Sequence, residues 1–335
     1  MKRFVTASTT IEKLLEKYPF TVTVLEEFSI PHKGKEVTDT LFSASKHAEV
    51  DVEILLEAVN SCIAKEVEDG FTSPEVTQAK PTGMDQFSMQ QKRIDENLAH
   101  ITHKIAVYSG KGGVGKTTVS VNLAAYLAKM GKTVCLLDAD IDCPNVNKVL
   151  GITESLRVDE KRKRLIPIEK HGMKVLSMAS LQQNEDTAIA WRGPMIAGAI
   201  RQFLEMTDWG NADYLIIDLP PGTSDAPMTL MQSMQLTGVI IVTTPQEVAV
   251  VDARKSANMT KKLGAQVLGV VENMAGEIFG SGGGKRVADA VDAPFLGSLS
   301  LLKGVRESSE KGIPAVLKEQ EVEKAFASIV QKLGL

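Results

Sequence analysis

The amino-acid sequence predicts an α/β protein in which a doubly wound, mostly parallel sheet follows a small N-terminal helical domain. From residue 103 onward, short apolar runs alternate with stretches of helical pattern. These runs are apolar throughout, which is typical of parallel strands that helices cover on both faces. A glycine-rich turn follows the first run and leads into a helix, as in phosphate-binding α/β units. The predicted strands are Ile105–Ser109, Thr133–Asp138, Val175–Met178, Tyr214–Asp218, Val239–Thr243, Val267–Glu272 and Phe295–Gly297.

Residues 1–69 are predicted to form the small helical domain. A first helix is expected to begin near Thr10 and to end at Tyr18, which precedes a proline. Further helices are expected over Thr21–Phe28 and over Val50–Ala64, where apolar residues recur at helical spacing. The unit is similar to small helical modules found beside redox and iron–sulfur repair proteins. The turn that usually carries cysteines in those modules carries none here.

Residues 70–102 are predicted to be a linker followed by a polar helix, because glycine and proline dominate the first part. Residues 103–335 are predicted to form the larger domain. His100 and His103 could share one side of the helix, but two ligands are too few for a metal site.

Composition excludes several classes of protein. The chain has 335 residues, of which 43% are hydrophobic and 24% charged, and its net charge is -4. This balance argues against a broadly basic nucleic-acid binder. No uncharged apolar run reaches the ~18 residues that a membrane helix needs, and the N-terminus does not resemble a signal peptide. With three cysteines and no Cys-x-x-Cys, the sequence predicts a cytoplasmic protein with no nucleic-acid or membrane partner.

The most informative segment is Ser109–Thr118, which reads SGKGGVGKTT. A strand, a glycine-rich turn and a helix start direct several backbone N–H groups at one point, where they can hold nucleotide phosphates. Lys116 is placed to neutralise the β- and γ-phosphates, and the Thr117 hydroxyl to bind Mg²⁺. The alternative, a glycine-rich turn with a chance lysine, does not explain the strand before it and the helix after it. The predicted nucleotide-binding residues of this loop are Gly110, Gly112, Gly113, Val114, Gly115, Lys116, Thr117 and Thr118.

Acidic residues close two of the predicted strands. Asp138 and Asp140 follow one strand in an Asp-x-Asp pair, and Asp218 ends another. Carboxylates at strand ends beside a phosphate site can hold Mg²⁺ or orient an attacking water. After Asp218, two prolines and Gly222 make a stiff bend, and the Gly222 N–H could move to meet a γ-phosphate. We therefore predict Thr117, Asp138 and Asp218 as the metal site, and Gly222 as a switch that distinguishes ATP from ADP.

The run GKGGVGKTT, with its early Lys111, resembles the deviant phosphate loop (deviant Walker A) of the ParA, MinD and nitrogenase iron protein superfamily. Lys111 lies too early in the loop to occupy the place of Lys116. The resemblance implies that two subunits enclose two ATP molecules and that Lys111 acts on the partner's nucleotide. A solvated surface lysine is the alternative. The resemblance also assigns the water-orienting role to Asp140 and leaves Asp138 nearer the metal.

Later blocks resemble the Mrp/NBP-type branch, the ATP-binding iron–sulfur cluster carriers. These blocks are Trp191-Arg192-Gly193-Pro194-Met195, Asp218–Thr223, Val242–Ala249 and Gly269–Met274. The resemblance implies that Asn273 hydrogen-bonds the adenine edge, which a side-chain amide can do. It further implies a slow, Mg²⁺-dependent ATPase with Lys111, Lys116 and Asp140 in catalysis, and a homodimer that serves apo iron–sulfur client proteins.

The chain departs from this branch where cluster carriers place a Cys-x-x-Cys, shortly after the Glu-Asn-Met segment. Here Met274 continues directly into Ala275-Gly276-Glu277 without a cysteine. A cluster needs soft thiolate ligands, typically about four. Cys135 lies in a predicted strand, and Cys143 is either an inert loop cysteine or a thiolate that meets its symmetry mate. The prediction is therefore an ATP-hydrolysing dimeric switch that carries clusters or assists their assembly, with a ParA/MinD-like positioning protein as the alternative.

Overall fold

The structure is a computed structural model of the chain and describes residues 4–32, 38–68, 83–140, 143–178 and 193–334. The chain divides into two units, Met1–Met89 and Gln90–Leu335. The division falls within the segment predicted as linker and helix, in the helix α5 (Gly83–Leu98). Each unit has its own hydrophobic core.

The N-terminal unit is a cluster of short helices around one core. Thr10 caps the first helix, because its side chain accepts a hydrogen bond from the Lys13 N–H. Ile11, Leu14 and Leu55 are fully buried in the centre. The sequence did not predict α3, which offers only a single apolar turn. The helices are α1 (Ile11–Lys17), the 3₁₀ turn η1 (Pro19–Thr21), α2 (Val22–Glu27), α3 (Leu41–His47) and α4 (Val52–Glu68).

The C-terminal unit is built on an eight-stranded sheet, in which only the edge strand β5 runs antiparallel to its neighbour. All seven predicted strands are present, so the prediction of a mostly parallel sheet is confirmed. Three short strands were not predicted, because each has three residues and none is an apolar run. The spatial order of the sheet is β10 (Phe295–Ser300), β9 (Val267–Ala275), β8 (Gly238–Thr243), β1 (Ile101–Tyr108), β7 (Ala212–Asp218), β2 (Val134–Asp138), β6 (Met173–Ser177) and β5 (Ile168–Lys170), and β3 (Arg157–Asp159) pairs separately with β4 (Arg164–Ile166).

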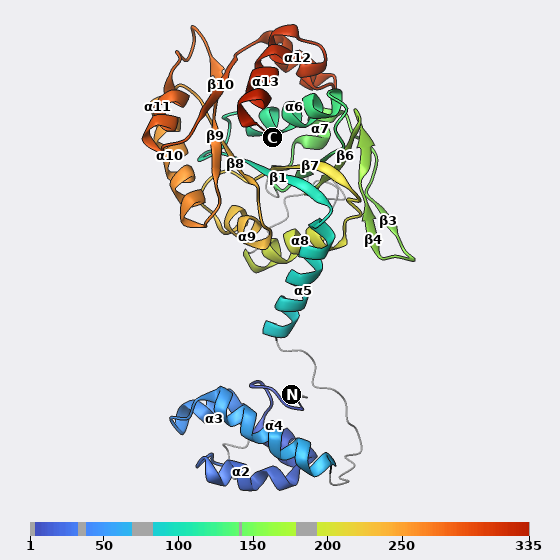
Figure 1. The fold of residues 1–335 in the computed structure, drawn as a ribbon, viewed down its shortest axis with the longest axis vertical. Coiled ribbons are helices and arrows are strands. Elements are labelled where there is room, and N and C mark those ends of the chain that lie inside the picture. Colours follow the sequence, from blue (N-terminus) through green and yellow to red (C-terminus); the bar gives the residue numbers. More distant parts are fainter. Residues whose placement is uncertain (1–3, 33–37, 69–82, 141–142, 179–192, 335) are drawn as a thin grey trace. The chain divides into compact units, whose positions relative to one another are not determined.

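Helices cover both faces of this sheet (Figure 1). Along β1, Ala106 and Tyr108 point into one core while Ile105 and Val107 point into the other. This alternation within the buried half of the strand, residues 105–108, confirms the doubly wound architecture. One core is closed by α5, α8 (Gly193–Met206), α9 (Asp225–Ser233), α10 (Glu247–Lys262) and α11 (Gly283–Ala290), and the other by α6 (Lys116–Lys129), α7 (Val146–Leu150), the turn η4 (Ala315–Leu317), α12 (Lys303–Glu310) and α13 (Gln320–Leu333).

The register of the parallel strands collects the predicted acidic residues at one edge. Asp138 at the end of β2 is the direct neighbour of Asp218 at the end of β7. Asp218 is in turn paired with Val107 of β1, which lies two residues before the glycine-rich loop. In an open parallel sheet, ligands bind at the carboxyl ends of the strands. The fold therefore places the loop and both carboxylates where a ligand is expected.

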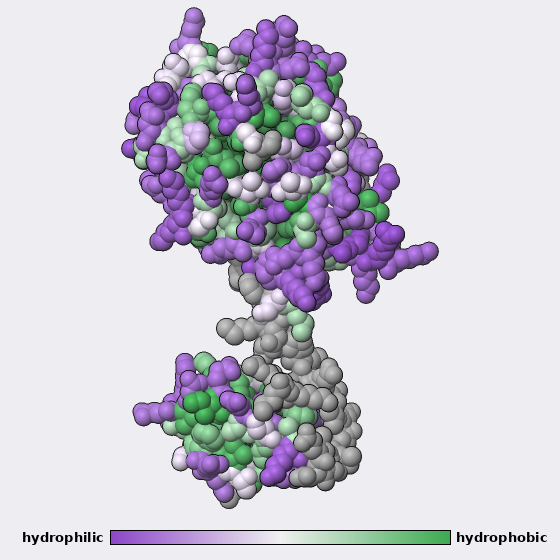
Figure 2. All heavy atoms as spheres, in the orientation of Figure 1, coloured by the Kyte–Doolittle hydropathy of each residue, from purple (hydrophilic) through white to green (hydrophobic). Residues whose placement is uncertain are grey.

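Polar and charged side chains project around the rim of the C-terminal unit on the face drawn in Figure 2. Among the described residues, no helix is both long and apolar enough to cross a membrane.

Candidate nucleotide-binding site

The glycine-rich loop joins β1 to α6 at the middle of the sheet. A cavity of about 480 Å³ opens beside it. Gly115, in the left-handed conformation with φ +83°, is the N-cap of α6. Because the first N–H groups of a helix have no partner within the helix, this end of α6 can hold a phosphate. The loop residues that line the cavity are Ser109, Lys111, Gly112, Gly113, Gly115, Lys116, Thr117 and Thr118.

Two glycines of the loop are required by close contacts. A Cβ atom added to Gly110 would lie 2.3 Å from the carbonyl carbon of Asp252 in α10. One added to Gly115 would lie 2.0 Å from the side-chain Nδ2 of Asn273. The loop therefore fits against both α10 and the end of β9 without room for side chains.

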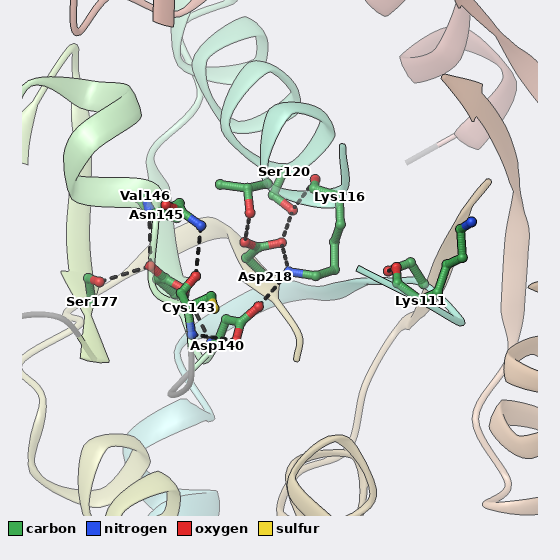
Figure 3. A network of polar contacts seen from close by, with 12 residues as sticks. Lys111, Lys116, Ser120, Asp140, Cys143, Asn145, Val146, Ser177 and Asp218 are labelled. Carbon is green, nitrogen blue, oxygen red and sulfur yellow. Dashed lines mark hydrogen bonds and ion pairs between the residues drawn. The ribbon is translucent and has the colours of Figure 1, made fainter. Parts of the chain in front are cut away.

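Three polar side chains of α6 converge on Asp218, which is fully buried (Figure 3). Lys116 Nζ donates to Asp218 Oδ1 at 2.9 Å, and Thr117 Oγ1 donates to Oδ2 at 2.6 Å. Ser120 Oγ donates to Oδ1 at 2.8 Å. Thr117 and Asp218, two of the three predicted metal ligands, are thus in direct contact.

The side chain of Lys116 is almost fully buried among negative charges. Burial alone lowers the pKa of the Lys116 ammonium, but Asp218 and then Asp140, whose Oδ2 lies 3.6 Å from Nζ, outweigh it and raise the pKa above its ordinary value. Lys116 is therefore charged at neutral pH. Its counter-charges in this structure are carboxylates, and nucleotide phosphates carry the same sign of charge.

Asp138 is fully buried, and both of its carboxylate oxygens accept hydrogen bonds from neighbouring residues. Oδ2 accepts hydrogen bonds from the Val146 N–H at 3.1 Å and from Ser177 Oγ at 2.9 Å, and Oδ1 accepts one from the Asp140 N–H at 3.2 Å. Burial, together with the charge of Asp218, raises the pKa of Asp138 to about 7. Asp138 thereby fixes the start of α7 and the backbone of Asp140. Its predicted role as a metal ligand stays a prediction.

Asp140 faces both the cavity and Lys116. It is only 6% exposed, and its Oδ1 accepts a hydrogen bond from the Cys143 N–H at 3.2 Å. Because Asp138 holds its backbone and Cys143 its side chain, the carboxylate is fixed at the cavity wall. This placement suits a residue that orients a water molecule.

Lys111 lies in the same loop but points away from the carboxylates around Lys116 (Figure 3). Its backbone carbonyl accepts a hydrogen bond from Ser109 Oγ at 3.0 Å, which fixes the turn. The ammonium group is therefore directed away from the site that Lys116 serves.

Gly222 adopts a left-handed conformation with φ +79°, and its N–H donates to the Ser109 carbonyl at 3.0 Å. The N–H that was predicted to meet a γ-phosphate is thus engaged with the backbone. Pro221, directly before it, lines the cavity.

Asn273 ties the end of β9 to the phosphate loop. Its Nδ2 donates to the Val114 carbonyl at 2.9 Å. Asn273 also lines a second cavity of about 180 Å³, to which Thr118 contributes from the loop side. This cavity is bounded by β10 and α13, where Leu299 and Phe326 supply apolar walls. An amide beside an apolar recess next to the phosphate loop can recognise a base edge.

Sequence reasoning missed several residues of the site. Ser120 lies three residues after Thr117 on α6, so helical spacing alone could have placed it on the same side. Cys143, Asn145 and Lys148 line the 480 Å³ cavity opposite the loop. No spacing rule links this segment to the loop, because it reaches the cavity only through the fold.

Other sequence features lie apart from the cavity. His103 stacks on Tyr214 with ring centroids 5.0 Å apart, so it serves packing. Within the described ranges, no group of three or more His, Cys, Asp or Glu side chains could hold a metal ion. Cys135 is buried in β2, where burial raises the pKa of its thiol to about 11. Trp191 and Arg192 lie outside the described residues.

Known proteins resemble the C-terminal unit closely. A curated iron–sulfur cluster carrier protein of Methanocaldococcus jannaschii is 45% identical over 258 residues, which cover 74% of this chain and 89% of the relative. One of Aquifex aeolicus is 46% identical, covering 70% of this chain and 68% of the relative. A solved structure of the nucleotide-binding protein of Archaeoglobus fulgidus in complex with ADP matches with a TM-score of 0.61 and 36% identity, covering 70% of this chain and 96% of that one. Pyrococcus furiosus MinD, at 24% identity and a TM-score of 0.57, shares the fold.

A sequence model of the NUBPL iron-transfer P-loop NTPases, within the ParA group, matches residues 100–334. This range includes the loop, both strand-end carboxylates and Asn273. The match covers well over half of the chain and agrees with the relatives above. The chain therefore belongs to the NUBPL-type iron-transfer P-loop NTPase family.

Proposed function

We propose that this protein is an ATP-operated homodimeric switch that acts in iron–sulfur cluster assembly or delivery. The observation that carries the proposal is the convergence of Lys116, Thr117 and Ser120 on Asp218 beneath the glycine-rich loop. A buried lysine, a hydroxyl and a strand-end carboxylate are the parts that a Mg²⁺-dependent NTPase needs at this point of the fold.

ATP would bind with its phosphates against the loop N–H groups and its base in the cavity beside Asn273. Lys116 would then exchange its contact with Asp218 for phosphate oxygens. The Thr117 hydroxyl and the Asp218 carboxylate fit Mg²⁺, which prefers oxygen ligands. Bound Mg²⁺ would supply positive charge to the β- and γ-phosphates.

Hydrolysis would use the carboxylate of Asp140. Held at the cavity wall, it can accept a hydrogen bond from a water molecule and aim its oxygen at the γ-phosphorus. The new P–O bond forms as the bond to the β,γ-bridging oxygen breaks, so that ADP and phosphate leave and a proton is released. We expect a slow reaction, because it is linked to the rearrangement of a dimer.

The homodimer is part of the proposal because of Lys111. Its side chain points away from Lys116 and from the carboxylates that Lys116 contacts (Figure 3). A cation at the rim of the cavity and directed away from Lys116 could reach the nucleotide of a second subunit, where it would stabilise the γ-phosphate charge as an arginine finger does.

The iron–sulfur role rests on the cluster carrier names of the relatives. This chain has three cysteines and no Cys-x-x-Cys, so it lacks the paired thiolates that a shared cluster requires. The only cysteine that the structure places in the cavity lining is Cys143, which is exposed. We therefore favour an assembly partner that serves apo client proteins, with a ParA/MinD-like positioning protein as the second candidate.

The switch is tested by comparing Lys111→Ala with the wild type in analytical ultracentrifugation. We expect the wild type to dimerise with a non-hydrolysable ATP analogue but not with ADP. The variant should bind both nucleotides and stay monomeric, with turnover reduced about a hundredfold or more. Lys132→Ala, an exposed lysine after α6, serves as the matched control. Unchanged association and turnover in Lys111→Ala would refute the shared site.

The iron–sulfur role needs a separate experiment. The protein is reconstituted anaerobically with iron and sulfide, with and without ATP, and its iron content and visible absorbance are measured beside Cys143→Ser. Iron that disappears in Cys143→Ser would identify a cluster shared between two subunits. If no iron is retained, the Mg-ATP-dependent activation of an apo iron–sulfur client distinguishes an assembly partner from a positioning protein.

A further inference from the structure

Tyr108, the last residue of β1, contacts the segment that follows β7. Its side chain is fully buried, and its hydroxyl donates a hydrogen bond to the Gly222 carbonyl at 2.5 Å. The next residue, Ser109, accepts the Gly222 N–H at 3.0 Å. Both backbone polar groups of Gly222 are therefore held by two consecutive residues at the end of β1.

The conformation of Gly222 depends on these contacts. It has φ +79°, a value that glycine adopts without strain, and it follows two stiff prolines. Since Pro221 lines the 480 Å³ cavity, a small rotation here would move backbone groups at the cavity wall. In the present conformation the Gly222 N–H is bound to Ser109 and is not free for a phosphate.

The environment of Tyr108 keeps its hydroxyl a donor. Burial raises the pKa of Tyr108 to about 12, and Ser256 of α10 is within hydrogen-bonding reach of the same oxygen. Ser256 is itself fully buried. The phenol thus joins the start of the phosphate loop, the segment after Asp218 and α10 at a single point.

We propose that Tyr108 is a positioning residue. It holds Gly222 in the conformation seen here, in which the Gly222 N–H is bound to Ser109, and so weakens the binding of ATP relative to that of ADP. The proposal rests on the proposed function. For its N–H to reach a γ-phosphate, Gly222 must leave Ser109, and its carbonyl then leaves the Tyr108 hydroxyl. ADP makes no such demand. The hydrogen bond from Tyr108 therefore opposes ATP binding alone.

The test is Tyr108→Phe, which removes the hydroxyl and keeps the ring. Dissociation constants for ADP and for a non-hydrolysable ATP analogue are measured by titration calorimetry. In the variant, the Gly222 carbonyl loses its hydrogen-bond donor in the conformation in which the Gly222 N–H is bound to Ser109, so that conformation is destabilised. We therefore expect the affinity for the ATP analogue to rise about five- to tenfold. Affinity for ADP should change less than about twofold. Tyr214→Phe, on the neighbouring strand β7, is the matched control, since its ring is also buried. Equal shifts for both nucleotides, or none, would overturn the proposal.

A second measurement needs no nucleotide. Hydrogen exchange of the peptide that contains Gly222 is followed by mass spectrometry in the ligand-free protein. In Tyr108→Phe this amide should exchange about five- to tenfold faster than in the wild type, while peptides of β7 exchange at the same rate. Unchanged exchange would refute the role of Tyr108 even if ATP binds. A wild type that binds neither nucleotide, with faster exchange in the variant, would refute the proposed function while leaving the contact between Tyr108 and Gly222 established.

Discussion

Replacement of Lys116 by methionine should destabilise the ligand-free C-terminal unit strongly. Methionine keeps most of the length of the side chain but removes the charge that Asp218, at 2.9 Å, and Asp140, at 3.6 Å, share. Asp218 is fully buried, and Asp138 beside it is too. Removing one partner of a buried ion pair costs about 3–5 kcal/mol, since the remaining charge is left uncompensated.

The assay is urea unfolding at pH 7 in the presence of EDTA, followed by tryptophan fluorescence. The protein has two tryptophans, Trp191 and Trp209, and both belong to the C-terminal unit, so the signal reports on this unit alone. With a slope of about 3 kcal/mol per molar urea, the midpoint should fall by roughly 1–1.7 M.

Two further variants decide the cause. Lys129→Met makes the same substitution on the same helix, but Lys129 pairs with Glu323 at the surface, where both side chains are more than a third exposed. It should change the stability by less than about 1 kcal/mol. Adding Asp218→Asn to Lys116→Met removes one of the unpaired charges and should recover part of the loss. A Lys116→Met protein that unfolds at the wild-type midpoint would refute the electrostatic reasoning.

Three other predictions follow from the same region and from β9. Burial raises the pKa of Asp138 to about 7 in the folded protein, so between about pH 4 and 7 the folded protein keeps a proton that the unfolded chain releases. The free energy of unfolding should therefore fall as the pH rises through this range, by up to about 1.4 kcal/mol per pH unit. Asp138→Asn should flatten that slope in urea unfolding at several pH values, and an unchanged slope would contradict the assignment. Gly115→Ala should destabilise the unit by more than about 2 kcal/mol, because it adds a clash to a left-handed backbone. Gly131 also has a left-handed φ of +81° but open space around it, so Gly131→Ala measures the backbone strain without the clash. Equal losses of stability in both variants would show that the clash is unimportant. Glu272→Gln should cost about 1–3 kcal/mol, because the buried carboxylate accepts two backbone N–H groups and an amide nitrogen cannot. The exposed Glu277→Gln is its control, and thermal unfolding measures both.

The sequence predicted the main sheet because its strands are long apolar runs. β1 and β7 have buried residues on both faces, so their pattern was unambiguous. The short strands β3, β4 and β5 were missed, since three residues give no periodicity. β9 continues beyond its predicted end at Glu272 to Ala275, although Met274 adopts the left-handed φ of +59°.

The residue types of the site were predictable, but their mutual contacts were not. Order along the chain places Lys116, Asp138 and Asp218 at one edge of the sheet. It does not reveal that Lys116 binds Asp218 directly, or that Asp138 holds the loop of Asp140. Those contacts depend on the strand register, which places Asp138 beside Asp218. Strand register cannot be predicted from a single sequence. The contact of Tyr108 with Gly222 was missed for the same reason, as a tyrosine in an apolar strand looks like ordinary core.

The pairing of Lys116 with Asp218 also bears on how any anion reaches the loop. Asp218 supplies the negative counter-charge of Lys116 from within the chain, and the Thr117 hydroxyl donates to the same carboxylate. Side chains of the protein itself therefore tie the first turn of α6 to the end of β7. An anion that binds to Lys116 must compete with this carboxylate for the ammonium group.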